Sequence, residues 1–233
     1  ILLIAVMIVI FYPPYLRGLF FEEDQLPSEI FVFLVFAAFW VFKALKKDRK
    51  FLVTPIDYAS LGFAVVYFLS LFASVHMRLA IVEWLKYCMY FAVFFIVTEL
   101  AEEYKFRIGI LWVIVVSGTG VAFLGLDAAA GGHVVGALNQ LFKVLGASQD
   151  VFFELFKDNR IYSVLQYPNA LAAYLMGIFF VTLGLIMSSK RLWVRAIAGG
   201  IGFMLLVTFA FTISRGAYLV MGVALVIYII VLP

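Results

Sequence analysis

Long apolar stretches, separated by short polar segments, make up most of the chain. Because an α-helix rises about 1.5 Å per residue, about 20 apolar residues are needed to cross the hydrocarbon core of a membrane. This length predicts eight membrane-spanning helices, the first of them shortened at its start. They comprise residues 1–16, 29–45, 56–75, 80–98, 108–126, 168–187, 192–212 and 216–232. The predicted fold class is therefore all-α, a polytopic bundle of transmembrane helices.

The composition excludes a soluble globular domain. Of the 233 residues, 66% are hydrophobic and 13% are charged, and the mean hydropathy is +1.13. A soluble domain carries about half apolar and roughly a quarter charged residues, so this apolar surplus requires lipid as its solvent. We expect a single transmembrane domain over 1–233, within a longer protein. The single Cys88 excludes an intrachain disulfide bond.

The distribution of basic residues predicts the orientation of the helices. In the eight-helix arrangement, ten basic residues fall on one side of the membrane and six on the other. The ten are Lys43, Lys46, Lys47, Arg49, Lys50, Lys105, Arg107, Lys190, Arg191 and Arg195, and the six are Arg17, Arg78, Lys143, Lys157, Arg160 and Arg215. Short loops rich in Lys and Arg stay in the cytoplasm. The side with the six is therefore predicted to be the outer face.

The only long connection, residues 127–167, falls on this outer face. Within it, the apolar residues of "HVVGALNQLFKVLG" recur with helical spacing, which predicts an amphipathic helix. They are Val134, Val135, Leu138, Leu141, Phe142 and Leu145. A helix of this kind either lies in the membrane interface or packs on the outer ends of the bundle. The pattern is compatible with both.

Two arginines on the predicted outer face lie close to helix starts. Arg160 precedes Pro168, whose missing N–H suits the first turn of a helix. Arg215 follows Ser214, a favourable N-cap residue. Unpaired N–H groups at two helix N-termini, beside two guanidinium groups, indicate an anion site and favour phosphate. The alternative is that both arginines only anchor helices at the interface.

Two polar residues next to these helix starts have two interpretations each. Asn169 either caps its helix or binds a ligand, and Tyr167 either belongs to the interfacial aromatic belt or contacts a ligand. With Ser214, they are the candidate substrate-binding residues.

Four segments give the chain a resemblance to a known family. "RIYSVLQYPNALAAYL" is followed one helical hairpin later by "TFAFTISRGAYLVMG", and earlier come "YPPYLRGLFFEEDQLP" and "LSLFASVHMRLAIVEWLKY". Together they resemble the bacterial O-antigen ligase and O-antigen polymerase family over nearly the whole sequence. The Arg…Pro-Asn and Ser-Arg-Gly segments are the most specific parts of the match.

The resemblance implies a membrane glycosyltransferase with the GT-C type of fold. Such an enzyme acts on the outer face of the bacterial cytoplasmic membrane, on a glycan carried by undecaprenyl diphosphate. It transfers that glycan to an acceptor, which is a glycan, a lipid or a protein. The sequence leaves open whether the product is a ligated glycan or a polymer of repeat units.

Site roles also follow from the resemblance. The family's outer-face arginines hold the diphosphate, and this catalytic role passes to Arg160 and Arg215 by motif match. Fixed guanidinium groups and helix N-termini stabilise the leaving diphosphate without a metal or another cofactor. A general base must still accept the proton of the acceptor hydroxyl. In some members of the family this base is a histidine in an outer loop that lies later in the chain than residue 233. His76 and His133 are therefore not assigned as the general base.

An acidic segment provides an alternative mechanism. Glu22, Glu23 and Asp24 are expected in the first outer loop, where many GT-C enzymes bind a divalent cation with an acidic pair. We favour a solvated acidic loop that binds no metal.

The main rival function is a transporter or flippase for a lipid-linked glycan. Transporters carry charged residues in mid-span and broken helices. Here Glu83 and Lys86 have the spacing of an ion pair on one helix face. Gly184, Gly199, Gly200 and Gly202 are expected to permit close helix packing. A membrane scaffold without activity is a third possibility. The basic clusters are explained by topology, so no nucleic-acid partner is expected.

Overall fold

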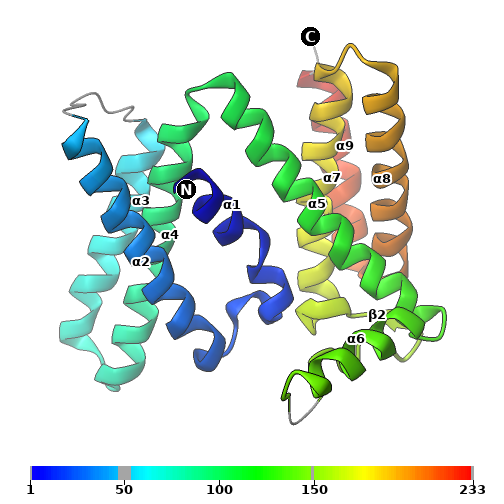
Figure 1. Ribbon diagram of the computed structural model, residues 1–233, viewed down its shortest axis with the longest axis horizontal. Coiled ribbons are helices and arrows are strands. Elements are labelled where there is room, and N and C mark those ends of the chain that lie inside the picture. Colours follow the sequence, from blue (N-terminus) through cyan, green and yellow to red (C-terminus); the bar gives the residue numbers. More distant parts are fainter. Residues whose placement is uncertain (1, 47–53, 148–149, 232–233) are drawn as a thin grey trace. The chain divides into compact units, whose positions relative to one another are not determined.

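The computed structural model describes residues 2–46, 54–147 and 150–231, and these residues are almost entirely helical (Figure 1). The N-terminal half contains α1 (Leu2–Phe11), η1 (Pro13–Leu19), α2 (Glu22–Leu45), α3 (Pro55–Ser70), η2 (Leu71–Ala73), α4 (Met77–Ala101) and α5 (Tyr104–Ala129). The C-terminal half contains α6 (His133–Val144), β1 (Phe156–Lys157), β2 (Arg160–Ile161), η3 (Ser163–Leu165), α7 (Pro168–Ser188), α8 (Leu192–Phe211) and α9 (Arg215–Val231). The all-α prediction is confirmed, and the structure adds one short β-hairpin whose two strands have two residues each.

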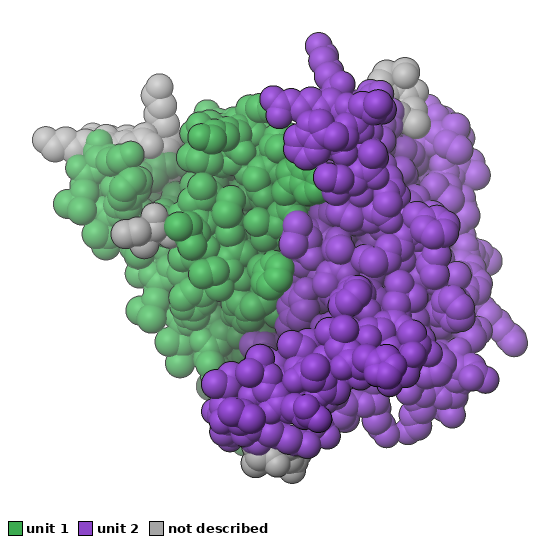
Figure 2. Space-filling model, turned by 45° about the vertical axis from the view of Figure 1, so that its right-hand side comes forward, with its two compact units in different colours: residues 1–13, 19–113 green, residues 14–18, 114–233 purple. Residues whose placement is uncertain are grey.

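The chain forms two compact units, shown in different colours in Figure 2. Unit 1 comprises residues 1–13 and 19–113, and unit 2 comprises residues 14–18 and 114–233. In unit 1, α2 packs on α1 and α4, and α3 packs on α4. In unit 2, α7 packs on α8 and α9. The boundary between the units falls within α5.

Within the described residues, six helices are long and apolar enough to cross a membrane, which indicates a multi-pass membrane protein. They are α2, α3 with η2, α4, α5, α7 and α8. The first predicted span is instead α1 and η1, which are bent by 58°. The bend lies at Pro13 and Pro14, which have no N–H to continue the helical hydrogen bonds. The last predicted span, α9, has only 17 described residues. A total of eight spans therefore stays a prediction.

Helix α2 corrects two expectations about charged residues. Glu22, Glu23 and Asp24 do not lie in a loop but form the first turn of α2, where carboxylates interact favourably with the helix dipole. Lys43 was expected in a cytoplasmic loop but lies in the last turn of α2, where it forms a buried ion pair with Glu99 of α4. The basic residues Lys47, Arg49 and Lys50 lie outside the described residues.

Glycines on α5 allow two close contacts within unit 2. A side chain at Gly120 would collide with the Tyr15 hydroxyl, which donates a hydrogen bond of 3.0 Å to the carbonyl of Ser117. A Cβ atom at Gly125 would lie 2.5 Å from Cγ2 of Ile161, in β2. These two glycines therefore fix η1 and the hairpin against α5.

The glycines that the sequence singled out for close packing mostly lack that role. Gly184, Gly199 and Gly200 have no atom within 4 Å of an added Cβ, so the prediction is wrong for them. Gly202 meets Thr182 of α7 at 3.8 Å, an ordinary van der Waals contact. A glycine in an apolar stretch does not by itself show that another helix approaches at that position.

Three residues separate α5 from α6, and hydrogen bonds hold one side of α6 within unit 2. The carboxylate of Asp127 accepts hydrogen bonds from the backbone N–H groups of Val134 and Val135, at 3.1 and 2.8 Å. The side chain of Asn139 donates to the carbonyl of Phe152 and accepts from its N–H, at 2.7 and 2.9 Å. Asp127 thus caps the helix, and Asn139 attaches it to the following loop.

The adjacent side of α6 is apolar and exposed. Leu145 is 72% exposed, and Val134 and Leu141 are exposed with it. Part of the apolar face of α6 therefore packs on the protein, and the rest is left exposed, as an interfacial helix would require.

A membrane interface over this exposed side predicts different surroundings for two neighbouring residues. Spin labels would be attached at Leu141→Cys or Gln140→Cys in a Cys88→Ser background. In bilayers, we expect the label at 141 to be accessible to oxygen and the label at 140 to a water-soluble nickel complex, because only 141 lies on the apolar side. Equal nickel accessibility at both positions would contradict an interfacial α6.

Candidate anion-binding site

A tight hairpin presents Arg160. Asp158 and Asn159 have φ angles of +49° and +55°, the left-handed conformation that both central residues of a type I′ turn require. The turn pairs Lys157 with Arg160 in antiparallel register. Beyond it, Ile161 is fully buried against α5. The register that buries Ile161 therefore directs Arg160 to the opposite side of the strand.

Arg160 holds the connection between α8 and α9. Its Nε donates a hydrogen bond of 2.8 Å to the carbonyl of Thr212, and its Nη2 makes a longer contact of 3.4 Å with the carbonyl of Ile213. Ile213 has a φ of +50°, which is unfavourable for a β-branched residue. A guanidinium has five N–H donors, so these two bonds leave others for a ligand. Arg160 thus positions the turn that precedes α9.

Both helix starts lie where the sequence predicts them. Pro168 is the first residue of α7 and is buried, and Tyr167 before it is extended, as a residue preceding proline usually is. Arg215 is the first residue of α9, and the carbonyl of Ser214 accepts a hydrogen bond of 3.0 Å from the N–H of Tyr218. The first N–H groups of both helices have no acceptor within their own helix.

One open cavity in unit 2 brings four of the five predicted site residues together. Its volume is about 620 Å³. Its polar lining consists of Arg160, Asn169, Ser214 and Arg215, and the remaining lining is Ala173, Met176, Ile213, Gly216, Ala217 and Val220. The sequence brings these residues together because α7 and α9 pack side by side and the hairpin reaches the turn between α8 and α9.

The electrostatics of this cavity favour an anion. Two guanidinium groups line it, and among the described residues neither has a carboxylate within ion-pair distance. Arg215 is exposed at the N-terminus of α9, so the helix dipole adds to its charge. A planar guanidinium can bind a phosphate or carboxylate through two parallel hydrogen bonds. The arrangement can therefore hold a phosphate group.

The structure gives different results for the three predicted substrate-binding residues. Asn169 is the second residue of α7 and not its N-cap, so the capping interpretation is wrong and its side chain lines the cavity. Ser214 has the N-cap position of α9, but in the described residues its hydroxyl makes no hydrogen bond to that helix. Tyr167 is 57% exposed and does not line the cavity.

The apolar part of this cavity lies outside the residues predicted from the sequence. Ala173 and Met176 lie four and seven residues after Asn169, so the three share one side of α7. Ala217 and Val220 line the opposite wall from α9. The spacing of four and seven residues from Asn169 is the sequence signal that could have identified Ala173 and Met176 as lining residues. The cavity therefore combines a polar end near both helix starts with apolar walls along α7 and α9.

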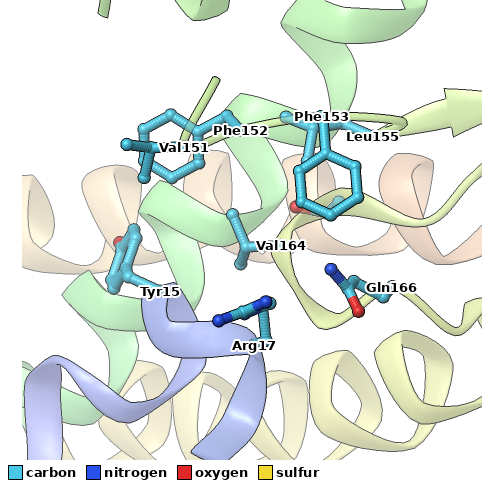
Figure 3. A pocket seen from close by; sticks show the side chains of 9 residues that line it. Tyr15, Arg17, Val151, Phe152, Phe153, Leu155, Val164 and Gln166 are labelled. Atoms are coloured by element: carbon cyan, nitrogen blue, oxygen red, sulfur yellow. The ribbon is translucent and has the colours of Figure 1, made fainter. Parts of the chain in front are cut away.

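A third arginine lines a separate small cavity (Figure 3). Arg17 and Tyr15 of η1 lie opposite Phe152, Phe153 and Gln166, as Figure 3 shows. The volume of about 10 Å³ is enough for one water molecule. Arg17 has a φ of +53°, so the bent end of η1 holds it in a conformation unusual for its residue type. This cavity is too small for a sugar or a phosphate.

The acidic first turn of α2 makes an ion pair with the first turn of α4. Glu22 forms an exposed ion pair with Arg78, with an N–O distance of 2.7 Å. In the part of the chain that the structure describes, no group of three or more His, Cys, Asp and Glu side chains could hold a metal ion.

Comparisons with known proteins give no match, whether with family models, curated proteins or solved structures. The interpretation of the site therefore rests on its geometry and on the motifs of the sequence.

Proposed function

We propose that the chain is a membrane glycosyltransferase that transfers a glycan from undecaprenyl diphosphate to an acceptor, in the manner of an O-antigen ligase. The observation that carries the proposal is the cavity with Arg160, Arg215 and Asn169 at its polar end and apolar walls beyond. Such a cavity suits an amphipathic donor, with a diphosphate at the arginines and a polyprenyl chain along the walls. The sequence motifs point to the same donor.

In the proposed reaction, an acceptor hydroxyl attacks the anomeric carbon of the glycan. The new carbon–oxygen bond forms as the bond to the diphosphate oxygen breaks, with inversion at the anomeric carbon. Negative charge grows on the diphosphate, where Arg160, Arg215 and the N–H groups of α9 stabilise it. The hydroxyl proton passes to a general base, which we assign to none of these residues. The guanidinium groups take the role that a metal ion has in other glycosyltransferases.

Orientation belongs to the proposal as well. The cavity would open to the outer face of the bacterial cytoplasmic membrane, where the resemblance places the transfer reaction. A polymerase of the same family uses the same donor, with a second lipid-linked glycan as its acceptor. The two activities differ in product length.

The test uses the full-length protein in lipid bilayers with an undecaprenyl-diphosphate-linked glycan and an acceptor. We expect donor consumption with or without EDTA and a sharp decrease in the Arg160→Lys/Arg215→Lys variant, because lysine keeps the charge but loses the two-pronged geometry. A single added glycan indicates a ligase, and a ladder of products indicates a polymerase. Donor movement across the bilayer without glycan transfer would replace the proposal with a flippase.

A further inference from the structure

Unit 1 contains a buried carboxyl group that the proposed reaction does not use. Glu29 lies two turns into α2, on the side that packs against α4, and is only 2% exposed. Its burial was not expected, because the sequence places it at the edge of an apolar stretch. An ionisable side chain inside a membrane-spanning helix is costly and is usually functional.

A neutral amide is the hydrogen-bond partner of Glu29. Nε2 of Gln25, which is itself 4% exposed, donates a hydrogen bond of 2.7 Å to Oε1 of Glu29. The same Nε2 lies 3.5 Å from the carbonyl of Val82 in α4. An amide N–H can donate to a carboxylate or to the carbonyl oxygen of a carboxylic acid. This geometry therefore accepts Glu29 with or without a proton.

Lys86, the cation that interacts with Glu29, already has an anionic partner. Nζ of Lys86 forms an ion pair of 2.5 Å with Glu83, as the sequence predicts. The titratable groups of α4 close enough to Glu29 for an electrostatic interaction are Lys86, Cys88 and Tyr90. Helix α1, which packs on both α2 and α4, contributes only apolar side chains.

The charges of Glu29, Glu83 and Lys86 balance only when one of the two carboxylates binds a proton. Glu29 and Glu83 with one ammonium, that of Lys86, leave a net charge of −1, whereas protonation of one carboxylate makes the group neutral. Glu83 is half-exposed and lies against the ammonium, but Glu29 is buried beside an amide. Ionisation is therefore more costly at Glu29.

We propose that Glu29 is a proton-binding site within the helices of unit 1, with Lys86 and Glu83 as its counter-charges. With the proton bound, Lys86 pairs with Glu83 and Glu29 is a neutral acid held by Gln25. When the proton leaves, two carboxylates compete for the single ammonium. Loss of the proton thus weakens the pair between Glu83 and Lys86 and changes the contact between α2 and α4. This inference is independent of the arginine site, which belongs to unit 2.

A hydrophobic carbodiimide tests the proposal, because it modifies protonated carboxyl groups in apolar surroundings. The full-length protein in bilayers would be treated at a series of pH values, and the modified residues identified by peptide mass spectrometry. We expect modification at Glu29 that falls about tenfold per pH unit once the proton is lost. Glu83 is the matched control, a carboxylate on the neighbouring helix that should stay unmodified at neutral pH.

Two variants and one additional measurement complete the test. Glu29→Gln keeps the shape and the neutral state, and we expect it to fold and to lose both the modification and a carboxylic-acid band in the infrared spectrum. Lys86→Met should extend the modification to higher pH, because ionised Glu29 loses the ammonium that interacts with it. Absence of modification at Glu29 in the folded wild type at every pH would overturn the proposal. Protection by Na+ or Mg2+ at constant pH would overturn it in favour of a metal cation.

Discussion

Replacement of Arg215 by alanine is expected to lower turnover of the lipid-diphosphate donor by about 100- to 1,000-fold, the usual effect of losing one group that stabilises transition-state charge. The fold should tolerate the change. Arg215 is exposed at the start of α9, and within the described residues no hydrogen bond or ion pair to its side chain is present. The loss of turnover would therefore report on the ligand alone.

Arg160→Ala should lower both turnover and stability, whereas Arg215→Ala should lower turnover alone. The carbonyls of Thr212 and Ile213 lose their donor, which costs about 1–3 kcal/mol of folding free energy if water does not replace it. Turnover and thermal stability would be measured together, with Lys157→Ala as the control because Lys157 lies opposite Arg160 in the hairpin and is exposed. Normal turnover in Arg215→Ala would make these arginines membrane anchors.

Gly125→Ala is expected to destabilise unit 2 and to displace the hairpin that carries Arg160. The added Cβ would lie 2.5 Å from Cγ2 of Ile161 and 3.2 Å from Cβ of Ser163, and both residues are fully buried. Overpacking of this kind costs about 1–3 kcal/mol. Because Ile161 adjoins Arg160, we also expect weaker donor binding.

A double-mutant cycle can assign this effect to the contact with Ile161. Stability in detergent would be compared for Gly125→Ala, Ile161→Ala and the double variant. The glycine substitution should cost much less when Ile161 is already alanine. Gly184→Ala in α7 is the control, because no atom lies within 4 Å of its added Cβ and alanine favours a helix. An equal cost in both backgrounds would mean that α5 does not fix the hairpin through this contact.

The sequence was most informative about the site where local chemistry determines local structure. Pro168 starts α7, and the Ser214–Arg215 step starts α9, because the conformation of these residues depends on their immediate neighbours. That both starts line one cavity follows from the packing of α7 with α9 and from the bond between Arg160 and Thr212. Such contacts between distant segments leave no periodic signal.

The errors have a common physical origin. Hydropathy measures the average character of a stretch, so it gave no sign of the bend at Pro13 and began α2 only at Glu29. The helix dipole and the proline backbone decide those boundaries instead. Hydropathy likewise could not show that Lys43 is buried with Glu99, or that Glu29 faces α4. Charged residues near helix ends are ambiguous until their partners are known.

The position of residues 14–18 in the chain affects how unit 2 folds during synthesis. Residues 14–18 belong to unit 2, although about a hundred residues separate them from the rest of that unit. During synthesis, Tyr15 leaves the ribosome long before Gly120, the position on α5 against which its hydroxyl packs. Unit 2 therefore cannot be completed from its C-terminal part alone, and a truncation that removes the first 18 residues would leave this face of α5 uncovered. Deletions that include residues 14–18 would act on the unit that carries the arginines.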